Sequence, residues 1–322
     1  MQAEPLIEWS EPVMELIGFI ALFLTSGAIG FRYSSLRGKL APVTATSADA
    51  TIYATAARRA ALLGLIGSLI AMIRAVQALP GLAARAHTTT GALLSSNSGA
   101  QMLIGFAVLT LIGFLLASGR LSVGWPLAAI GVVAGTLRGL FSGKWSQLVN
   151  PMHELAAGLW IGTLFVMVIV GLALVLRKET PADRRGPIAA AMVNDFSPLA
   201  LACGGLVVLF GVITAWRHLN PLSSLWTTPY GWALIAKLVV VAVVFALGAW
   251  NWQRGRPTLG TEAGAYGLKR SATGELVAAG VVLLVTAILV SLPSPRRPGA
   301  GGPPGAPPGA GGPPAGAPGG AQ

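Results

Sequence analysis

The sequence predicts an all-α, polytopic integral membrane protein with eight transmembrane helices. The 322 residues are 54% hydrophobic and only 10% charged, a composition with too few charges for a soluble domain of this length. Eight long stretches carry few or no charges, and basic residues gather on every second connection between them. Since a bilayer core of about 30 Å needs roughly 20 apolar residues of helix, each stretch is long enough to cross.

Basic residues mark the borders of the first four crossings. The first ends before Arg32, the second begins after Arg58 and Arg59, and Arg120 separates the third from the fourth. The predicted spans are 13–31, 60–79, 98–117 and 121–141.

The last four crossings have similar borders. Arg177 follows the fifth, Arg217 ends the sixth, Arg254 follows the seventh, and Leu292-Pro293 closes the eighth. The predicted spans are 152–176, 196–216, 231–253 and 274–292.

The basic residues also predict an orientation. Connections after the first, third, fifth and seventh crossings hold 14 Lys and Arg residues, whereas the opposite side holds five. The positive-inside bias therefore predicts that both termini lie outside the cytoplasm. The acidic residues ahead of the first crossing, Glu4, Glu8 and Glu11, do not form a basic n-region, so we expect no cleaved signal peptide.

The chain divides into three predicted parts. Residues 1–149 form an N-terminal four-helix membrane half, and residues 150–292 form a second four-helix half. Residues 293–322 are nearly all Pro, Gly and Ala, a composition that cannot bury a core, so we expect a disordered tail.

Several function classes find no support in the residues. The basic clusters sit beside crossings rather than on one soluble face with aromatic residues, which argues against nucleic-acid binding. Gly143-Lys144 has Trp145 where a phosphate-binding loop needs Ser or Thr, so ATP use is not expected. No Ser-His-acid or Cys-His-acid cluster indicates an enzyme. The single cysteine, Cys203, reads as a packing residue.

The soft and borderline metal ligands have an informative distribution. The three histidines, His87, His153 and His218, all map to the outer side, as do Met102 and Met152. Imidazole together with thioether suits copper. Two alternatives remain: a haem held by His153 and His218 in an electron-transfer protein, or a membrane scaffold without its own metal.

Small residues predict close helix packing around His153. His153 and Trp160 are seven residues apart, which places them on one helical face. Gly158 and Gly162 form a small-xxx-small pair on the same helix, and the fourth crossing holds three glycines at the same spacing, Gly131, Gly135 and Gly139. Both helices can therefore pack backbone against backbone.

Three cations lie inside predicted crossings. Snorkelling to the interface accounts for Arg74 and Arg138, but Lys237 is about two turns deep, where a charge is costly without a partner or a wet cavity. Glu15 and Glu154 lie on the same side and are candidate partners. These charges predict a polar vestibule that faces outward.

The second half resembles the bacterial copper resistance protein D (CopD) family. The resemblance covers about 150–293 in ordered motifs, whereas the first half is similar only in layout. The matching stretches are Met152-His153-Glu154-Leu155-Ala156-Ala157-Gly158-Leu159-Trp160-Ile161-Gly162, Asp195-Phe196-Ser197-Pro198-Leu199-Ala200, Thr228-Pro229-Tyr230-Gly231 with Lys237, Asn251 and Arg254, and Lys269-Arg270-Ser271 with Glu275.

The resemblance implies a copper-handling protein of the bacterial plasma (inner) membrane, active in copper uptake or resistance. It carries over His153 and Trp160 as motif positions, with Tyr230, Lys237 and Glu275 as further matches. We expect a copper ion as ligand, the lipid bilayer as environment and a periplasmic copper-binding protein as partner. His153 is the expected principal ligand, completed by His218, Met152 or Met102, with His87 less important.

Overall fold

A computed structural model describes residues 9–40, 48–141, 143, 147–219, 222–255, 258 and 260–292. In this part of the chain the secondary structure is helical, without a strand, and seven helices are long and apolar enough to cross a membrane. The predicted multi-pass, all-α membrane protein is confirmed. The predicted tail, 293–322, lies outside the described residues.

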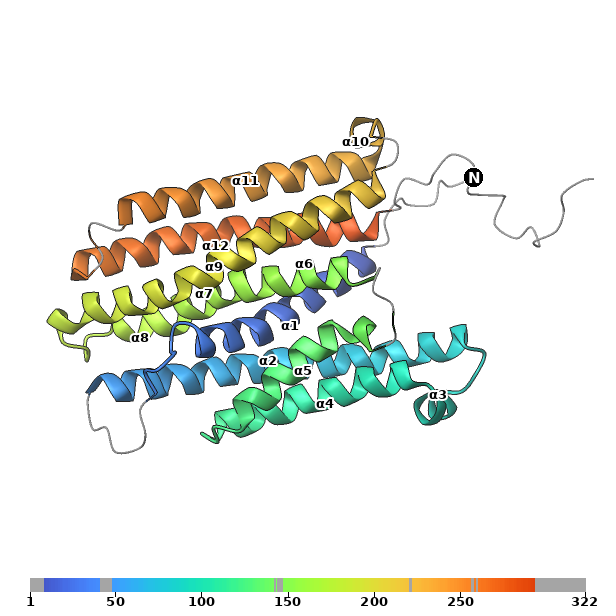
Figure 1. The fold of residues 1–322 in the computed structure, drawn as a ribbon, viewed down its shortest axis with the longest axis horizontal. Helices are drawn as coiled ribbons and strands as arrows, with labels where there is room; N and C mark the ends of the chain where they lie inside the picture. Colours follow the sequence, from blue (N-terminus) through green and yellow to red (C-terminus); the bar gives the residue numbers. More distant parts are fainter. Residues whose placement is uncertain are drawn as a thin grey trace, which may run out of the picture.

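The helices follow the predicted order of crossings (Figure 1). The first half contains α1 (Ser10–Tyr33), α2 (Ala48–Arg85), α3 (Thr90–Ser96), α4 (Ser98–Ser118), α5 (Gly124–Thr136) and the 3-10 turn η1 (Arg138–Leu140). One continuous helix follows, made of α6 (Val149–Ala157), the π-helical turn η3 (Gly158–Gly162), α7 (Thr163–Val166), the π-helical turn η4 (Met167–Leu172) and α8 (Ala173–Val175). The rest is α9 (Ala182–His218), α10 (Ser224–Thr227), α11 (Pro229–Gly255) and α12 (Glu262–Ser291).

The long helices lie side by side along a common axis, so the bundle has two ends (Figure 1). We call one the histidine end: it holds the first turns of α1, α4, α6 and α11, and His87 and His153 lie there. The opposite end, which we call the basic end, holds Lys39, Arg184 and Arg185.

The eighth crossing is the one point of the predicted count that is not confirmed. The fourth predicted span was 121–141, but α5 contains 13 residues, which makes a helix of about 20 Å at 1.5 Å per residue. A 3-10 turn then continues the chain to Leu140. The seven longer helices match the other predicted spans.

Three helices extend well beyond their predicted crossings at the basic end, and here the predicted loops are wrong. Arg58 and Arg59 lie on α2, Arg184 and Arg185 lie on α9, and Lys269 and Arg270 lie on α12. Apolar windows locate only the part of a helix that lies in hydrocarbon. Charged residues such as Lys and Arg are good helix formers, so each helix continues into the polar layer.

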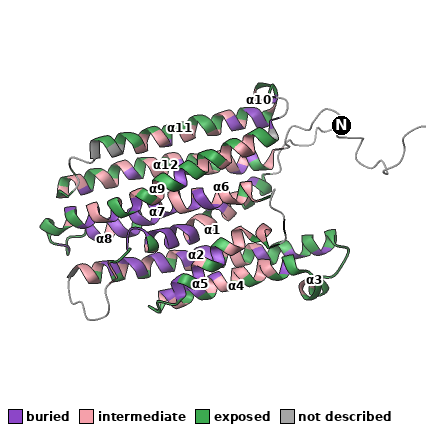
Figure 2. Cartoon of the chain, in the orientation of Figure 1, coloured by how far each residue is buried: buried purple, intermediate pink, exposed green. Residues whose placement is uncertain are grey.

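The centre of the bundle is α1 with the segment from α6 to α8. In the apolar 18-residue stretch of the Val149–Val175 helix, 67% of the residues are buried, whereas 11% are buried in the corresponding stretch of Pro229–Trp250. Figure 2 shows the same contrast, with buried residues concentrated in α1, α7 and α8 and exposed residues along α11. Because α1 contacts α2 and α5 as well as η3, α7 and α12, it connects helices from early and late parts of the chain.

The predicted backbone packing is confirmed and has α1 as its partner. A methyl group added at Gly27 of α1 would overlap the backbone of Gly162 in η3, and one added at Gly158 would meet Ser26 Oγ at 2.5 Å. In the fourth crossing, a methyl group at Gly131 would lie 2.7 Å from Thr110 N of α4. Glycine therefore sets how closely these helices approach.

Exposed aromatic residues mark both ends of the apolar surface. Trp9, Trp216, Trp226 and Trp232 are exposed at the histidine end, and Tyr33, Trp250 and Tyr266 are exposed toward the basic end. Trp and Tyr concentrate at the two membrane interfaces. Between these belts the surfaces of α9, α11 and α12 expose large apolar side chains such as Leu201, Val239 and Val277, as expected of faces that contact lipid.

A reporter experiment decides whether α5 crosses the membrane. Fusions after Ser122 and after Gly143 flank α5, and we expect them to report opposite sides, with Ser122 in the cytoplasm. A third fusion after Arg185 should also report the cytoplasm. If the Ser122 and Gly143 fusions report the same side, α5 does not span and the bundle has seven crossings.

A second prediction concerns the contact between α1 and η3. Gly27→Ala places a methyl group into the Gly162 backbone, so we expect the free energy of unfolding to fall by about 1–3 kcal/mol, the usual cost of overpacking. Thermal unfolding in detergent measures it. Gly105→Ala on α4 is the matched control because nothing lies within 4 Å of the added methyl group; equal melting temperatures for the two variants would contradict the prediction.

Candidate functional site

His153 lies in the second turn of α6 and packs across the helix interface onto α9. Its Nδ1 atom is 2.9 Å from the backbone carbonyl oxygen of Val207. The ring lies over Gly211, where an added methyl group would come within 3.1 Å of His153 Cε1. The absence of a side chain at Gly211 therefore lets the imidazole reach the α9 backbone.

This hydrogen bond determines which ring nitrogen carries the proton. A carbonyl oxygen can only accept, so Nδ1 must donate its N–H to Val207. In the neutral ring, Nε2 then holds the free lone pair. Among the described residues, no hydrogen bond to Nε2 is present. Histidine ligands of metals are commonly oriented in this way, with the second ring nitrogen held by a backbone carbonyl or a carboxylate.

Trp160 lies two turns further along the same face, as predicted from its spacing, and forms an aromatic contact below His153. Its ring centroid is 4.9 Å from that of Phe245 on α11. Both rings lie against Gly204 of α9, where an added methyl group would be 3.6 Å from Phe245 and 3.8 Å from Trp160. Gly204 and Gly211 are themselves seven residues apart, so two glycines on α9 face two rings on the continuous helix.

Lys237 of α11 completes this region electrostatically. Its charge acts on both His153 and Glu154, although the part of the chain that the structure describes contains no carboxylate within 4.0 Å of Lys237. The Glu154 carboxylate accepts a hydrogen bond from Asn150 Nδ2 at 2.6 Å.

The second candidate carboxylate, Glu15, has a different partner. Glu15 Oε1 of α1 is 3.6 Å from Arg74 Nη2 of α2, and Arg74 also donates a hydrogen bond to the Met14 carbonyl oxygen. The Arg74 guanidinium lies over Gly18. Arg74, which was expected to snorkel, is therefore held by α1.

A cavity of about 730 Å³ lies at the histidine end between α1, α4, η1 and α6. Met102, Arg138 and Glu154 are among its lining residues, but His153 is not. Consecutive residues of an α-helix point about 100° apart, so Glu154 faces the cavity while His153 faces α9. Of the charged residues that predicted a vestibule, Arg138 and Glu154 line this cavity, whereas Glu15, Arg74 and Lys237 are not among its lining residues. Met102 belongs to the cavity rather than to the His153 contact.

The other predicted positions are distributed over the bundle. Met152 is half-buried beside His153, and His87 is exposed in the turn after α2, with φ of 50°. The side chain of His218 lies outside the described residues. Tyr230 is buried in a small cluster with Leu219, Leu234 and Leu289.

Glu275 lies deeper in the bundle than the predicted vestibule. Its Oε2 would be 4.0 Å from a methyl group at Gly248 of α11. Lys237 is eleven residues from Gly248 on the same helix, about 16 Å along the axis. Within the described residues, no group of three or more His, Cys, Asp and Glu side chains could hold a metal ion.

Comparison with known proteins agrees with the resemblance in the second half. Residues 190–289 match the family model "Copper resistance protein D". This part of the chain is similar to the CopD family. The copper transport protein CutJ of Bacillus subtilis is 30% identical over 151 residues, which is 47% of this chain and 26% of CutJ. The chain thus spans about a quarter of this relative, and no solved structure matches.

The CopD segment contains the parts of the site that sequence reasoning missed. Val207 contributes a backbone atom, so no side-chain motif could have indicated it. Gly204 and Gly211 did leave a signal, because their spacing of seven equals that of His153 and Trp160. Phe245 gave none, since it is one apolar residue in a continuous apolar helix.

A substitution at Gly211, which lies in the segment that matches the family model, tests the orientation of His153. Gly211→Ala crowds the imidazole, so we expect the Nδ1–H hydrogen bond to Val207 to be lost. With three histidines in the chain, ¹⁵N-histidine labelling gives few ring signals, and the protected Nδ1–H resonance should disappear in this variant. Gly205→Ala, with nothing within 4 Å of the new methyl group, should retain it; retention in both variants would refute the assigned contact.

Proposed function

We propose that the protein binds copper at its histidine end, through His153 Nε2, and takes part in copper transport or resistance in the bacterial plasma membrane. The observation that carries the proposal is the hydrogen bond from His153 Nδ1 to the Val207 carbonyl oxygen. It leaves the lone pair of Nε2, on a neutral and half-buried imidazole, available to bind a metal ion. Imidazole is a common copper ligand.

The CopD match supports the metal. Its model covers 190–289, which includes Val207 and Gly211, so the family segment supplies the surface against which His153 packs. CutJ is described as a copper transport protein. These names and the geometry point to a transport or resistance protein rather than to an enzyme.

Further donors are available around His153 in this proposal. Met152 is its neighbour on α6 and half-buried, and His218 ends α9 at the same end of the bundle. Met102 and Glu154 line the neighbouring cavity, which we assign to entry of the ion rather than to its final coordination. The Glu154 carboxylate offsets the Lys237 charge, which would otherwise repel a cation.

The proposed orientation follows from the charge distribution. With 14 basic residues on one side against five on the other, the positive-inside bias places the basic end in the cytoplasm. The histidine end then faces the periplasm, where a copper-binding protein could deliver the ion. Both termini lie outside in this arrangement.

The proposal predicts a specific loss of affinity. His153→Ala removes the imidazole at a half-buried position, so we expect the copper affinity of the solubilised protein to fall at least tenfold, about 1.4 kcal/mol. Copper titration of the purified variants measures this. His87→Ala is the control because His87 is exposed in a turn; equal affinity in wild type and His153→Ala would remove His153 from the site.

Spectra and cells distinguish the remaining alternatives. A Soret band from the purified protein would indicate haem instead of copper. Protein that binds neither haem nor copper would be a membrane scaffold. Under the proposal, cells that carry the wild-type protein differ in copper accumulation from cells that carry His153→Ala, at equal amounts of protein in the membrane.

A further inference from the structure

Helix α9 consists of two halves with different tethers. Pro198 lies inside the helix, so the N–H that would bond to the carbonyl of Asn194 is missing, and proline rings are the commonest cause of helix bending. The residue directly before it, Ser197, donates a hydrogen bond from Oγ to the Val193 carbonyl oxygen at 2.8 Å. The helix can therefore bend at this point without losing its flanking turns.

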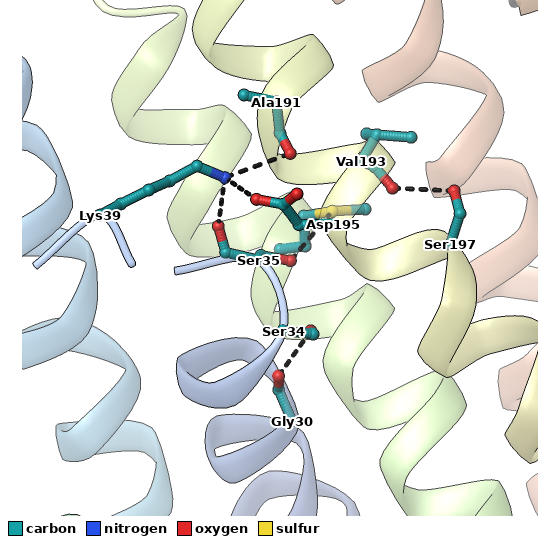
Figure 3. A network of polar contacts seen from close by, with 9 residues as sticks. Gly30, Ser34, Ser35, Lys39, Ala191, Val193, Asp195 and Ser197 are labelled. Carbon is teal, nitrogen blue, oxygen red and sulfur yellow. Dashed lines mark hydrogen bonds and ion pairs between the residues drawn. The ribbon is translucent and has the colours of Figure 1, made fainter. Parts of the chain in front are cut away.

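The half of α9 before Pro198 is held by charges at the basic end. Lys39 Nζ, in the segment after α1, donates hydrogen bonds to the carbonyl oxygens of Ser35 at 2.9 Å and Ala191 at 3.2 Å, and it forms an ion pair with Asp195. Figure 3 shows the amine between these three oxygens. The Lys39 side chain is 16% exposed and that of Asp195 is 42% exposed, so water reaches the pair from the Asp195 side.

Two more ion pairs tie the same half to other helices. Arg184 pairs with Asp49 of α2, and Arg185 pairs with Glu262 of α12. Arg185 also donates to the Thr180 carbonyl oxygen at 3.0 Å. Charges thus connect this half to α2, to α12 and to the segment after α1, all at the basic end.

The half after Pro198 has a different kind of contact. It carries Gly204, Val207 and Gly211, which meet Trp160 and His153. One helix therefore connects the copper-binding residue of the proposed function to the ion pairs of the basic end.

We propose that the Lys39–Asp195 pair is a lock that keeps the basic end of the copper path closed while the histidine end is open. Release of the lock lets the first half of α9 move about Pro198 and opens the basic end. The structure then corresponds to the first of these two states, because its cavity of 730 Å³ lies at the histidine end. Packed elements with two arrangements are the usual basis of such alternation. The inference rests on the proposed function for its cargo, but not for its test.

Cys203 is a natural reporter of this opening. It is the single cysteine of the chain, and its side chain is buried. It lies eight residues from Asp195 toward the histidine end, about 12 Å along the helix. A membrane-impermeant maleimide can therefore react with Cys203 from the basic side only when that end opens.

The experiment uses the full chain in inside-out membrane vesicles, without copper. We expect slow labelling of the wild type and about tenfold faster labelling of Asp195→Asn, because a charge-assisted contact is lost. Asp195→Glu keeps the charge and should label close to the wild-type rate. Lys39→Gln breaks the same pair from the other partner and should give the same acceleration as Asp195→Asn. Cys203→Ser gives the background.

Glu15→Gln is the matched control, since it breaks the Glu15–Arg74 pair on α1 at the opposite end and should not change labelling from the basic side. Fast labelling of the wild type from that side would overturn the proposal, and so would unchanged rates in both Asp195→Asn and Lys39→Gln. Because no copper is used, these outcomes are independent of the His153→Ala titration. If only the copper titration fails, the Lys39–Asp195 lock remains and the transported substrate is not copper.

Discussion

The close contact of α1 with η3 is the constraint on which the rest of the bundle depends. Gly27 and Gly162 meet backbone to backbone, and lipid provides no hydrophobic force that would draw two helices together, so van der Waals packing between small residues must do so. Since α1 also contacts α2, α5 and α12, it positions helices from early and late parts of the chain relative to one another. The depth of His153, which lies on the helix that continues into η3, follows from this contact.

The fold was largely predictable because backbone groups in hydrocarbon must form their hydrogen bonds within their own helix. Each crossing therefore leaves its own apolar stretch in the sequence. Seven of the eight predicted spans coincide with long apolar helices, and the glycine pair Gly158–Gly162 packs as its spacing indicated. The exception, α5, is short at 13 residues. The mean hydropathy of the predicted span includes the glycines of α5 and the turn that follows it. It therefore does not show where the helix ends.

The candidate site was predictable only in part, because its decisive contacts involve atoms that have no sequence signature. His153 and Trp160 were found from their spacing, but the acceptor for His153 is a backbone carbonyl of another helix. The division between Glu154 in the cavity and His153 on α9 depends on how α6 is rotated, and that rotation is set by its neighbours. A motif that names consecutive residues gives no information about such rotation.

The π-helical turns have a consequence for how this region changes during evolution. A π-helical turn holds one residue more than an α-helical turn would, and such turns are frequent at functional sites. The turn at Gly158–Gly162 holds its extra residue by widening, so the residues before and after it keep the faces that they would have in a regular α-helix. Loss of one residue there would restore regular α-helix and leave those faces in place, whereas a deletion in a purely α-helical stretch would rotate everything after it by about 100°. This segment can therefore change its length by one residue while His153 still faces α9.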